Sequence, residues 1–269
     1  MCGQDPAAVG YLVPAAIGTP TLISIVTVCL NPGPPLRACL ESVASQTFRA
    51  REHIVIDGGS GGETVAILRE RSDALAFWSS EPDSGIAEAM NKGLAHCTGD
   101  WLLFLHADDR LASPDALASV AQVLEATPAD VVGFPIYFGA GSRLLRPRGG
   151  GPWLRLKTGF LHQATFIRRQ VFERVGGYRP EYPLAMDYEF FLRCWLAGVR
   201  MATSEVVVPT HMGDTGLSSR KDWPTVRRRL ADERAIHQAH ARNRAQLALY
   251  WIYWKVYPAY KRTIAALLP

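Results

Sequence analysis

Cysteine is scarce in this chain of 269 residues, and the five cysteines form an odd, widely spaced set without a CxxC pair. The composition therefore excludes a small disulfide-stapled fold, and it predicts reduced thiols in a cytosolic protein. The five positions are Cys2, Cys29, Cys39, Cys97 and Cys194.

Long apolar runs are also missing, because no segment reaches the roughly 18 uninterrupted apolar residues of a membrane-spanning helix. No Lys or Arg precedes Arg37, so we expect no secretory signal, and residues 1–20 are predicted to be a loose leader. Internal repeats and low-complexity segments are lacking. With 48% hydrophobic and 20% charged residues, the chain is neither disordered nor collagenous, and its length suits one α/β domain with appendages or two small domains.

Charge is divided unevenly along the chain. Residues 220–269 hold eleven basic residues and three acidic ones, a net charge of +8, whereas the whole chain carries +4. The first 219 residues therefore carry −4. The two regions are expected to meet different partners.

Apolar runs and amphipathic stretches alternate in the first half of the chain. Strands are predicted at 22–29, 53–56, 76–79, 101–105 and 131–137, and helices at 36–46, 63–71, 86–96 and 114–126. The last helix is expected to have Ser113 as its N-cap and Pro114 at its first position. This alternation predicts a doubly wound, mostly parallel sheet flanked by helices, which binds ligands at the carboxyl ends of its strands.

The second half is less regular. Residues 139–151 are predicted to form an exposed hairpin or loop, 163–168 a strand, 169–175 a short helix and 186–197 a longer helix. A short strand at 206–208 is expected to close the domain. From Trp223 onward the chain is predicted to be helical and basic to its end.

Acidic residues follow three consecutive predicted strands. A single Asp in that position is typical of a turn or a helix cap, but carboxylates at neighbouring strand ends also suit a divalent cation that holds phosphate oxygens. His106 is either a further ligand or a structural histidine. The acids are Asp57, then Glu81 and Asp83, then Asp108 and Asp109.

Asp187 lies at or near the start of a predicted helix, in the run Ala185-Met-Asp-Tyr-Glu-Phe190. It is either a capping acid favoured by the helix dipole or a general base, which needs a carboxylate within reach of an acceptor hydroxyl.

The order of four segments resembles the inverting family 2 glycosyltransferases with the GT-A fold: 24–31 (SIVTVCLN), 56–60 (IDGGS), 81–93 (EPDSGIAEAMNKG) and 101–109 (WLLFLHADD). Two later segments, 160–166 (FLHQATF) and 186–193 (MDYEFFLR), resemble the subgroup of bacterial polysaccharide and glycolipid assembly. The resemblance covers residues 22 to about 219. It implies a catalytic domain over 21–219, and the charge and helical pattern of the remaining residues predict a basic helical tail over 220–269.

Residue roles follow from the resemblance. Asp187 matches the catalytic base, and Asp108 matches the metal-binding acid of the DxD motif, which implies a Mn²⁺ or Mg²⁺ cofactor. Three positions depart from the family pattern: His106 replaces the first DxD acid, Met186 replaces an acid before the base, and Met90 stands where many relatives have Arg. The residues implied to bind the donor are Thr27, Asn31, Asp57, Asp83 and Asp109.

Two further sites are hypotheses. His162 and Gln163 precede a strand on the acceptor side and either touch the acceptor or diphosphate or include a buried structural histidine. His211 opens a Gly-rich polar loop and either completes the metal site or belongs to a plain surface loop.

The tail combines Arg and Lys with the apolar, aromatic run 247–257, which suits a membrane interface. Because this run is too short to span a bilayer, it predicts in-plane association with an anionic membrane surface. The alternatives are a helix packed on the catalytic domain and a nucleic-acid patch. No recognition motif supports the last alternative, so we expect no nucleic-acid partner.

The leading hypothesis is an inverting glycosyltransferase of the hexosyltransferase type. It moves a sugar from a nucleotide-sugar donor to a hydroxyl of a lipid-linked or saccharide acceptor, and it is cytoplasmic and peripheral at the inner face of the bacterial membrane. A metal-dependent phosphoryl or nucleotidyl transferase fits less well, because 106–110 lacks the first Asp of a DxDx[TV] run and the prolines of 31–35 remove amide donors for phosphate. A non-catalytic membrane-associated module is the remaining alternative.

Overall fold

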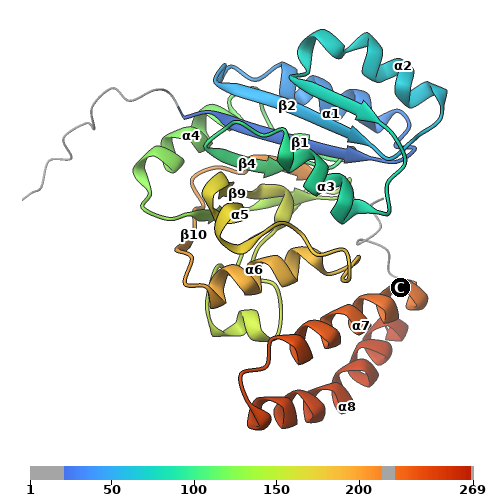
Figure 1. Ribbon diagram of the computed structural model, residues 1–269, viewed down its shortest axis with the longest axis vertical. Helices are drawn as coiled ribbons and strands as arrows, with labels where there is room; N and C mark the ends of the chain where they lie inside the picture. The colour runs from blue at the N-terminus through green and yellow to red at the C-terminus, as the bar shows by residue number, and fades with distance from the viewer. Residues whose placement is uncertain (1–20, 214–221, 268–269) are drawn as a thin grey trace, which may run out of the picture.

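A seven-stranded sheet lies between two layers of helices in the computed structural model, which describes residues 21–213 and 222–267 (Figure 1). The strand order is β10-β6-β9-β4-β1-β2-β3, and only β9 runs antiparallel to its neighbours. The doubly wound, mostly parallel sheet is thereby confirmed, while the predicted leader at 1–20 lies outside the described residues. The strands are β1 (Ile23–Cys29), β2 (Arg51–Asp57), β3 (Phe77–Ser80), β4 (Trp101–Phe104), β6 (Val131–Gly133), β9 (Thr165–Arg168) and β10 (Met201–Thr203).

Helices cover both faces of this sheet. One face packs against α1 (Pro35–Ala44), α2 (Gly62–Glu70) and α4 (Ala116–Ala126), and the other against α3 (Ile86–Ala95), α5 (Arg169–Val175) and α6 (Met186–Leu196). β1 is buried on both sides because its residues alternate: Ile23 and Ile25 join the first layer, and Val26 and Val28 join the second. The four described cysteines are buried free thiols.

A second, four-stranded sheet has the order β5-β11-β7-β8. It contains β5 (Arg110–Leu111), β7 (Ile136–Phe138), β8 (Arg143–Leu145) and β11 (Thr210–Met212). β5 directly follows Asp108 and Asp109, and it pairs with β11. This pairing brings the chain near residue 213 close to the end of β4. The described residues also contain the short 3-10 helices η1 (Ser72–Ala74), between α2 and β3, and η2 (Pro152–Arg155) and η3 (His162–Ala164), between β8 and β9.

Three predicted elements differ from the structure. The strand expected at 131–137 is divided into β6 and β7, in different sheets, at Pro135, which has no N–H for a ladder. Residues 206–208 form no strand and belong to the connection between β10 and β11. α4 begins at Ala116 without a side-chain cap, and the carbonyl of Ser113 accepts the side-chain amide of Gln46 at 2.7 Å.

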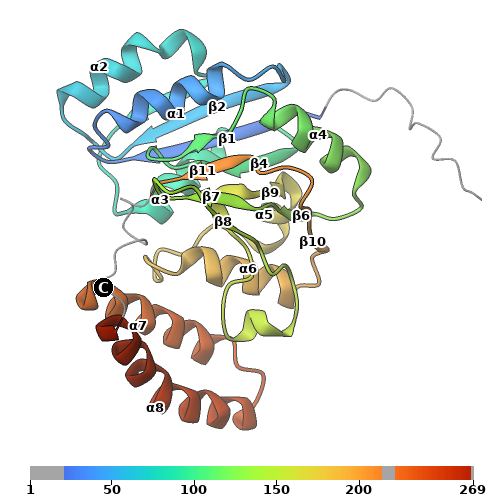
Figure 2. The same ribbon diagram turned by 180° about the vertical axis from the view of Figure 1, so that it is seen from behind.

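The C-terminal region is a helical hairpin of α7 (Trp223–Ala239) and α8 (Arg244–Leu267), with α8 at the outer edge of the molecule (Figure 2). Asp222 caps α7 by accepting the backbone N–H of Thr225 at 2.9 Å. Within the described residues, no helix combines the length and the apolar character needed to cross a bilayer.

Candidate active site

A cavity beyond the carboxyl end of β4 gathers side chains from α3, η3, α6 and β11. Its wall is partly apolar, with Ile86, Pro183, Leu184, Met186 and Met212. The polar lining consists of six residues singled out from the sequence, brought together from three separate segments: His106, Asp108, Asp109, His162, Gln163 and Asp187.

Asp187 lies in the first turn of α6, behind the N-cap residue Ala185. Burial raises the pKa of its carboxyl group, and the backbone N–H groups of Tyr188 and Asp187 partly oppose this. Met186, beside it in the cavity wall, contributes apolar surface where the family pattern has an acid. A carboxyl group with a raised pKa is better matched to proton abstraction near neutral pH.

Asp108 and Asp109 follow β4 but have different surroundings. Asp109 is buried and accepts the backbone N–H groups of His106 at 3.2 Å and of Gly213 at 3.0 Å. Burial and the neighbouring Asp108 raise the pKa of Asp109 to about 8. Gly213 comes so close that a Cβ there would lie 2.8 Å from the Asp108 carbonyl oxygen. Asp109 thus joins the segment after β4 to the residue that follows β11. Asp108 is the more exposed of the two carboxylates.

The donor set around Asp108 suits a divalent cation. Nε2 of His106 is buried and has no hydrogen-bond partner among the described residues. Burial lowers the pKa of His106, although Asp108 opposes this, so the ring is neutral and able to bind a metal. Carboxylate and imidazole together suit an ion such as Mn²⁺. Because residues 21–213 and 222–267 hold no cluster of three or more such side chains, a cation here needs additional oxygen ligands, such as those of a diphosphate.

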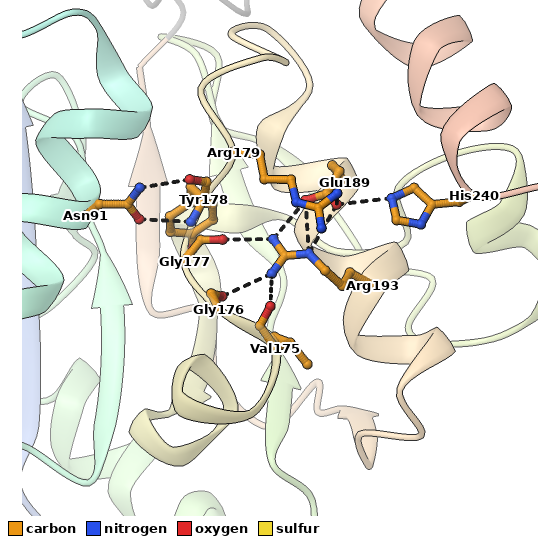
Figure 3. A network of polar contacts seen from close by, with 9 residues as sticks. All are labelled: Asn91, Val175, Gly176, Gly177, Tyr178, Arg179, Glu189, Arg193 and His240. Carbon is orange, nitrogen blue, oxygen red and sulfur yellow. Dashed lines mark hydrogen bonds and ion pairs between the residues drawn. The ribbon is translucent and has the colours of Figure 1, made fainter.

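His162 is buried, neutral and held in place. Its ring stacks on Phe104 with centroids 5.4 Å apart, and its Nε2 shares a 2.8 Å hydrogen bond with the Tyr178 hydroxyl. Burial, and then the neighbouring His106, lower the pKa of His162 to about 3. Asn91 in turn fixes Tyr178, because its side chain donates to the Tyr178 carbonyl and accepts the Tyr178 N–H, both at 2.8 Å (Figure 3). His162 is therefore both a cavity residue and a buried structural histidine.

Glu189, also on α6, is the centre of an ion network that the sequence analysis did not single out (Figure 3). Its fully buried carboxylate accepts hydrogen bonds from Arg193 at 2.8 Å and His240 at 3.1 Å, and it pairs with Arg179 at 3.2 Å. Burial opposes ionisation, but the hydrogen bonds from His240 and Arg193 lower the pKa of Glu189 below its ordinary value. Only the Glu189–Arg193 contact has a sequence signal, an i,i+4 spacing on one helix.

Arg193 extends this network to the loop before Tyr178. Its guanidinium group donates to the carbonyl oxygens of Val175, of Gly176 at 3.1 Å and of Gly177 at 2.8 Å. The helix that carries Asp187 and the loop that carries the partner of His162 are therefore fixed by one set of contacts.

Three residues of the predicted donor site lie along the strand ends, outside the lining of this cavity. Asp57 accepts the Ser80 hydroxyl at 2.6 Å, and hydroxyl groups of Ser60 and Ser80 lower its pKa although burial opposes this. Asp83 lies so close to Gly58 that a Cβ there would be 2.6 Å from its Oδ2. Asn31 has a left-handed φ of 48°, which Asn tolerates better than most residues.

The side chains of Thr27 and His211 lie outside the lining of the cavity. Thr27 is fully buried on the α1 side of the sheet, and its hydroxyl shares a 2.9 Å hydrogen bond with His53. His211 shares a 3.0 Å hydrogen bond with Ser142 and does not line the cavity, because residues alternate along β11 and Met212 takes that place. The structure does not bring either side chain to Asp108.

The sequence of this chain is similar to known glycosyltransferases. A family model described as Glycosyl transferase family 2 matches residues 24–180. A Mycobacterium tuberculosis protein described as an uncharacterized glycosyltransferase is 39% identical over 182 residues, which cover 65% of this chain and 69% of that protein. A PGL/p-HBAD biosynthesis glycosyltransferase from Mycobacterium bovis is 37% identical over 182 residues, with coverages of 65% and 70%.

Two solved structures share the fold. The S. aureus TarS structure in complex with UDP-GlcNAc has a TM-score of 0.66 at 17% identity and covers 80% of this chain and 65% of that one. The Pyrobaculum calidifontis mannosyltransferase PcManGT, in complex with GDP-Man and Mn²⁺, has a TM-score of 0.66 at 18% identity, with coverages of 93% and 74%. The sheet and its helices are thus those of the GT-A fold.

Proposed function

This chain belongs to glycosyl transferase family 2, and we propose that it is an inverting hexosyltransferase which moves a sugar from a nucleotide-sugar donor to a hydroxyl of a lipid-linked or saccharide acceptor. The observation that carries the proposal is the presence of Asp187 and Asp108 in one cavity, contributed by α6 and by the end of β4. Inverting transfer needs a base for the acceptor and a group that offsets charge on the leaving diphosphate.

Similar proteins support this choice of substrates. One relative takes part in PGL/p-HBAD biosynthesis, and the two solved structures hold UDP-GlcNAc or GDP-Man. We therefore propose a role in the assembly of bacterial glycans or glycolipids.

In the proposed reaction, Asp187 takes the proton of the acceptor hydroxyl. The acceptor oxygen forms its bond to the anomeric carbon while the bond from that carbon to the diphosphate oxygen breaks. Attack from the face opposite the diphosphate inverts the anomeric centre. The anomeric carbon therefore has to lie between Asp187 and Asp108, and the raised pKa of Asp187 suits it to this proton transfer.

The other residues divide into donor and acceptor groups. Asp108 and His106 would hold Mn²⁺ or Mg²⁺, whose chemistry when bound is to offset charge on the diphosphate. His162 and Gln163 would contact the acceptor or the diphosphate. The residues proposed for the donor are Asn31, Asp57 and Asp83 along the strand ends, with Asp109 and Thr27 supporting them from buried positions.

We also propose that residues 21–219 form the catalytic part and that 220–269 meet an anionic membrane surface at its cytoplasmic side. The charge division of the chain supports this arrangement, with −4 before residue 220 and +8 after it. A negative body that binds an anionic diphosphate is consistent with the need for a cation in the cavity.

A donor panel tests the proposed function. UDP-, GDP- and dTDP-sugars are added with Mn²⁺, with Mg²⁺ or with chelator, and thermal stability and nucleotide release are measured. We expect one donor to stabilise the protein and to be hydrolysed slowly, whereas Asp187→Asn binds it without hydrolysis. Asp73→Asn, which changes an exposed acid outside the cavity, is the matched control. If no donor stabilises the folded protein, the proposal is wrong.

A further inference from the structure

The outer side of α8 exposes a stripe of large apolar side chains. Their spacing of three, four and four residues places them on one face of the helix. Trp251, 61% exposed, lies on another side of α8, where Nζ of Lys255 sits 4.8 Å from the centre of its ring. An apolar face open to water marks an interaction surface. The members of this α8 stripe are Leu249 (66% exposed), Ile252 (57%), Val256 (65%) and Tyr260 (56%).

Another side of α8 packs against α7 and forms the buried contacts of the hairpin. Tyr250 and Trp254 are buried there: the Trp254 indole donates to Nδ1 of His237 at 3.0 Å, and the Tyr250 ring stacks on His237 at 4.5 Å. Nε2 of His237 shares a 2.9 Å hydrogen bond with the hydroxyl of Tyr188 on α6. The α8 stripe therefore lies away from the buried contacts of the hairpin, and both views show α8 at the outer edge of the molecule (Figure 1).

The charges of the hairpin match an anionic partner. α8 contains no acid, and three of its cations, Arg244, Lys255 and Arg262, are exposed and spaced by 11 and 7 residues, on one flank of the helix. The acids within α7 are turned toward the catalytic domain: Asp232 accepts the N–H of Leu184 at 2.8 Å, and Glu233 pairs with Lys157 at 3.7 Å.

The combination favours a lipid surface over other partners. An apolar stripe with aromatic residues and a cationic flank is the pattern of a helix that lies in the plane of a membrane. A second copy of this chain would set the same cations against each other, and a nucleic acid gains nothing from Leu249, Ile252 and Val256.

We infer that the α8 stripe docks on an anionic lipid bilayer and that the acceptor hydroxyl belongs to a lipid-linked molecule of that bilayer; the second part rests on the proposed function. The hairpin is attached to α6, the helix that carries Asp187. His237 of the hairpin bonds Tyr188, the residue after Asp187, and His240 bonds Glu189. Docking of α8 therefore holds the Asp187 cavity at a fixed position relative to the bilayer surface, where the head of a lipid-linked acceptor lies.

Vesicle binding tests the docking surface without any need for activity. The full chain is sedimented with vesicles of phosphatidylglycerol and phosphatidylcholine or of phosphatidylcholine alone. We expect binding to the anionic vesicles, which weakens at high salt. The triple variant Leu249→Ser/Ile252→Ser/Val256→Ser changes exposed residues only and is expected to bind at least about tenfold less, as is Lys255→Glu/Arg262→Glu. Val206→Ser, at an 80% exposed apolar position outside the hairpin, is the control and is expected to bind like the wild type.

Equal vesicle binding by the triple variant and the wild type would overturn the docking surface. It would also be overturned if the wild type bound no vesicles and formed a dimer, while the triple variant was a monomer. The acceptor class is tested by transfer to a lipid-linked acceptor in the same vesicles, which we expect to fall about tenfold or more in the triple variant while donor hydrolysis stays unchanged. If the wild type binds no donor, the proposed function fails while vesicle binding still reports on the surface. If donor hydrolysis is intact but the wild type transfers no sugar to the lipid-linked acceptor, the lipid-linked acceptor is refuted. If the wild type and the triple variant transfer equally well, the α8 stripe does not position the acceptor.

Discussion

Glu189→Gln is the most informative change to the framework of the cavity, because it removes one charge and preserves the size of the side chain. Breaking a buried ion pair costs about 3–5 kcal/mol. Arg193 is only 12% exposed but keeps its backbone carbonyl acceptors, while Arg179, 44% exposed, is partly hydrated and contributes less. We therefore expect a loss of roughly 2–3 kcal/mol in the free energy of unfolding.

Thermal and urea unfolding measure this loss. For a chain of this size each kcal/mol corresponds to roughly 2–4 °C, so the Tm is expected to fall by about 4–12 °C. Glu173→Gln is the matched control, because Glu173 and Arg169 form an i,i+4 pair on α5 at 3.0 Å with both side chains largely exposed. Such surface pairs contribute little. Equal Tm changes for the two variants would refute the role of the network.

The pH dependence of the free energy of unfolding tests the role of Glu189 in a second way. The pKa of Glu189 is lower in the folded protein than its ordinary value of 4.5. Its ionised form therefore stabilises the fold fully above that value, and this contribution is lost as the pH falls through the lowered pKa. The stability difference between wild type and Glu189→Gln is thus complete at neutral pH and shrinks below about pH 4.5. A difference independent of pH would contradict this.

Three further predictions concern the cavity and the sheet. Because the pKa of Asp187 is raised, the acid limb of the kcat/KM profile is expected above the pH at which an ordinary carboxyl group titrates. Tyr178→Phe removes the hydrogen bond to His162 and is expected to cost about 1 kcal/mol in urea unfolding and to lower kcat. Gly93→Ala brings a methyl group within 2.4 Å of Cγ1 of Val26, in the contact of α3 with β1, and is expected to cost about 1–3 kcal/mol in the same assay.

Each of these has a contrasting outcome. An acid limb at the titration of an ordinary carboxyl would contradict the raised pKa of Asp187. Unchanged stability and turnover in Tyr178→Phe would show that the hydroxyl does not hold His162. For the helix contact, Gly62→Ala on α2 is the control, because its Cβ would meet nothing within 4 Å, and it is expected to be neutral or stabilising by up to about 1 kcal/mol.

The sequence was sufficient for the parallel β1–β4 part of the sheet and for much of the cavity. Strand–helix alternation identifies β1 to β4 and the helices between them, and strand ends place Asp57, Asp83 and Asp108 on one edge. Asp187, predicted at a helix start, lies in the first turn of α6 and lines the same cavity as Asp108. The strands and helices depend on local periodicity, which a single sequence records, whereas the joint role of Asp187 and Asp108 was implied by the resemblance to the glycosyltransferase family.

Features that depend on distant contacts were not predictable. β9 is inserted antiparallel between β4 and β6, which no local pattern specifies. Glu189 binds partners from three segments, of which only Arg193 is its neighbour on one helix. His211 was one candidate for the metal site, but it lies on β11, where its ring bonds Ser142.

The central claim, that Asp187 is the base of a nucleotide-sugar transferase, is tested most directly by the transfer rate of Asp187→Asn with the donor that stabilises the protein. General-base catalysis contributes about 10²–10⁴-fold. We therefore predict unchanged donor affinity, a loss of transfer of at least about 100-fold, and an inverted anomeric centre in the wild-type product. A variant that transfers the sugar as fast as the wild type would contradict the account.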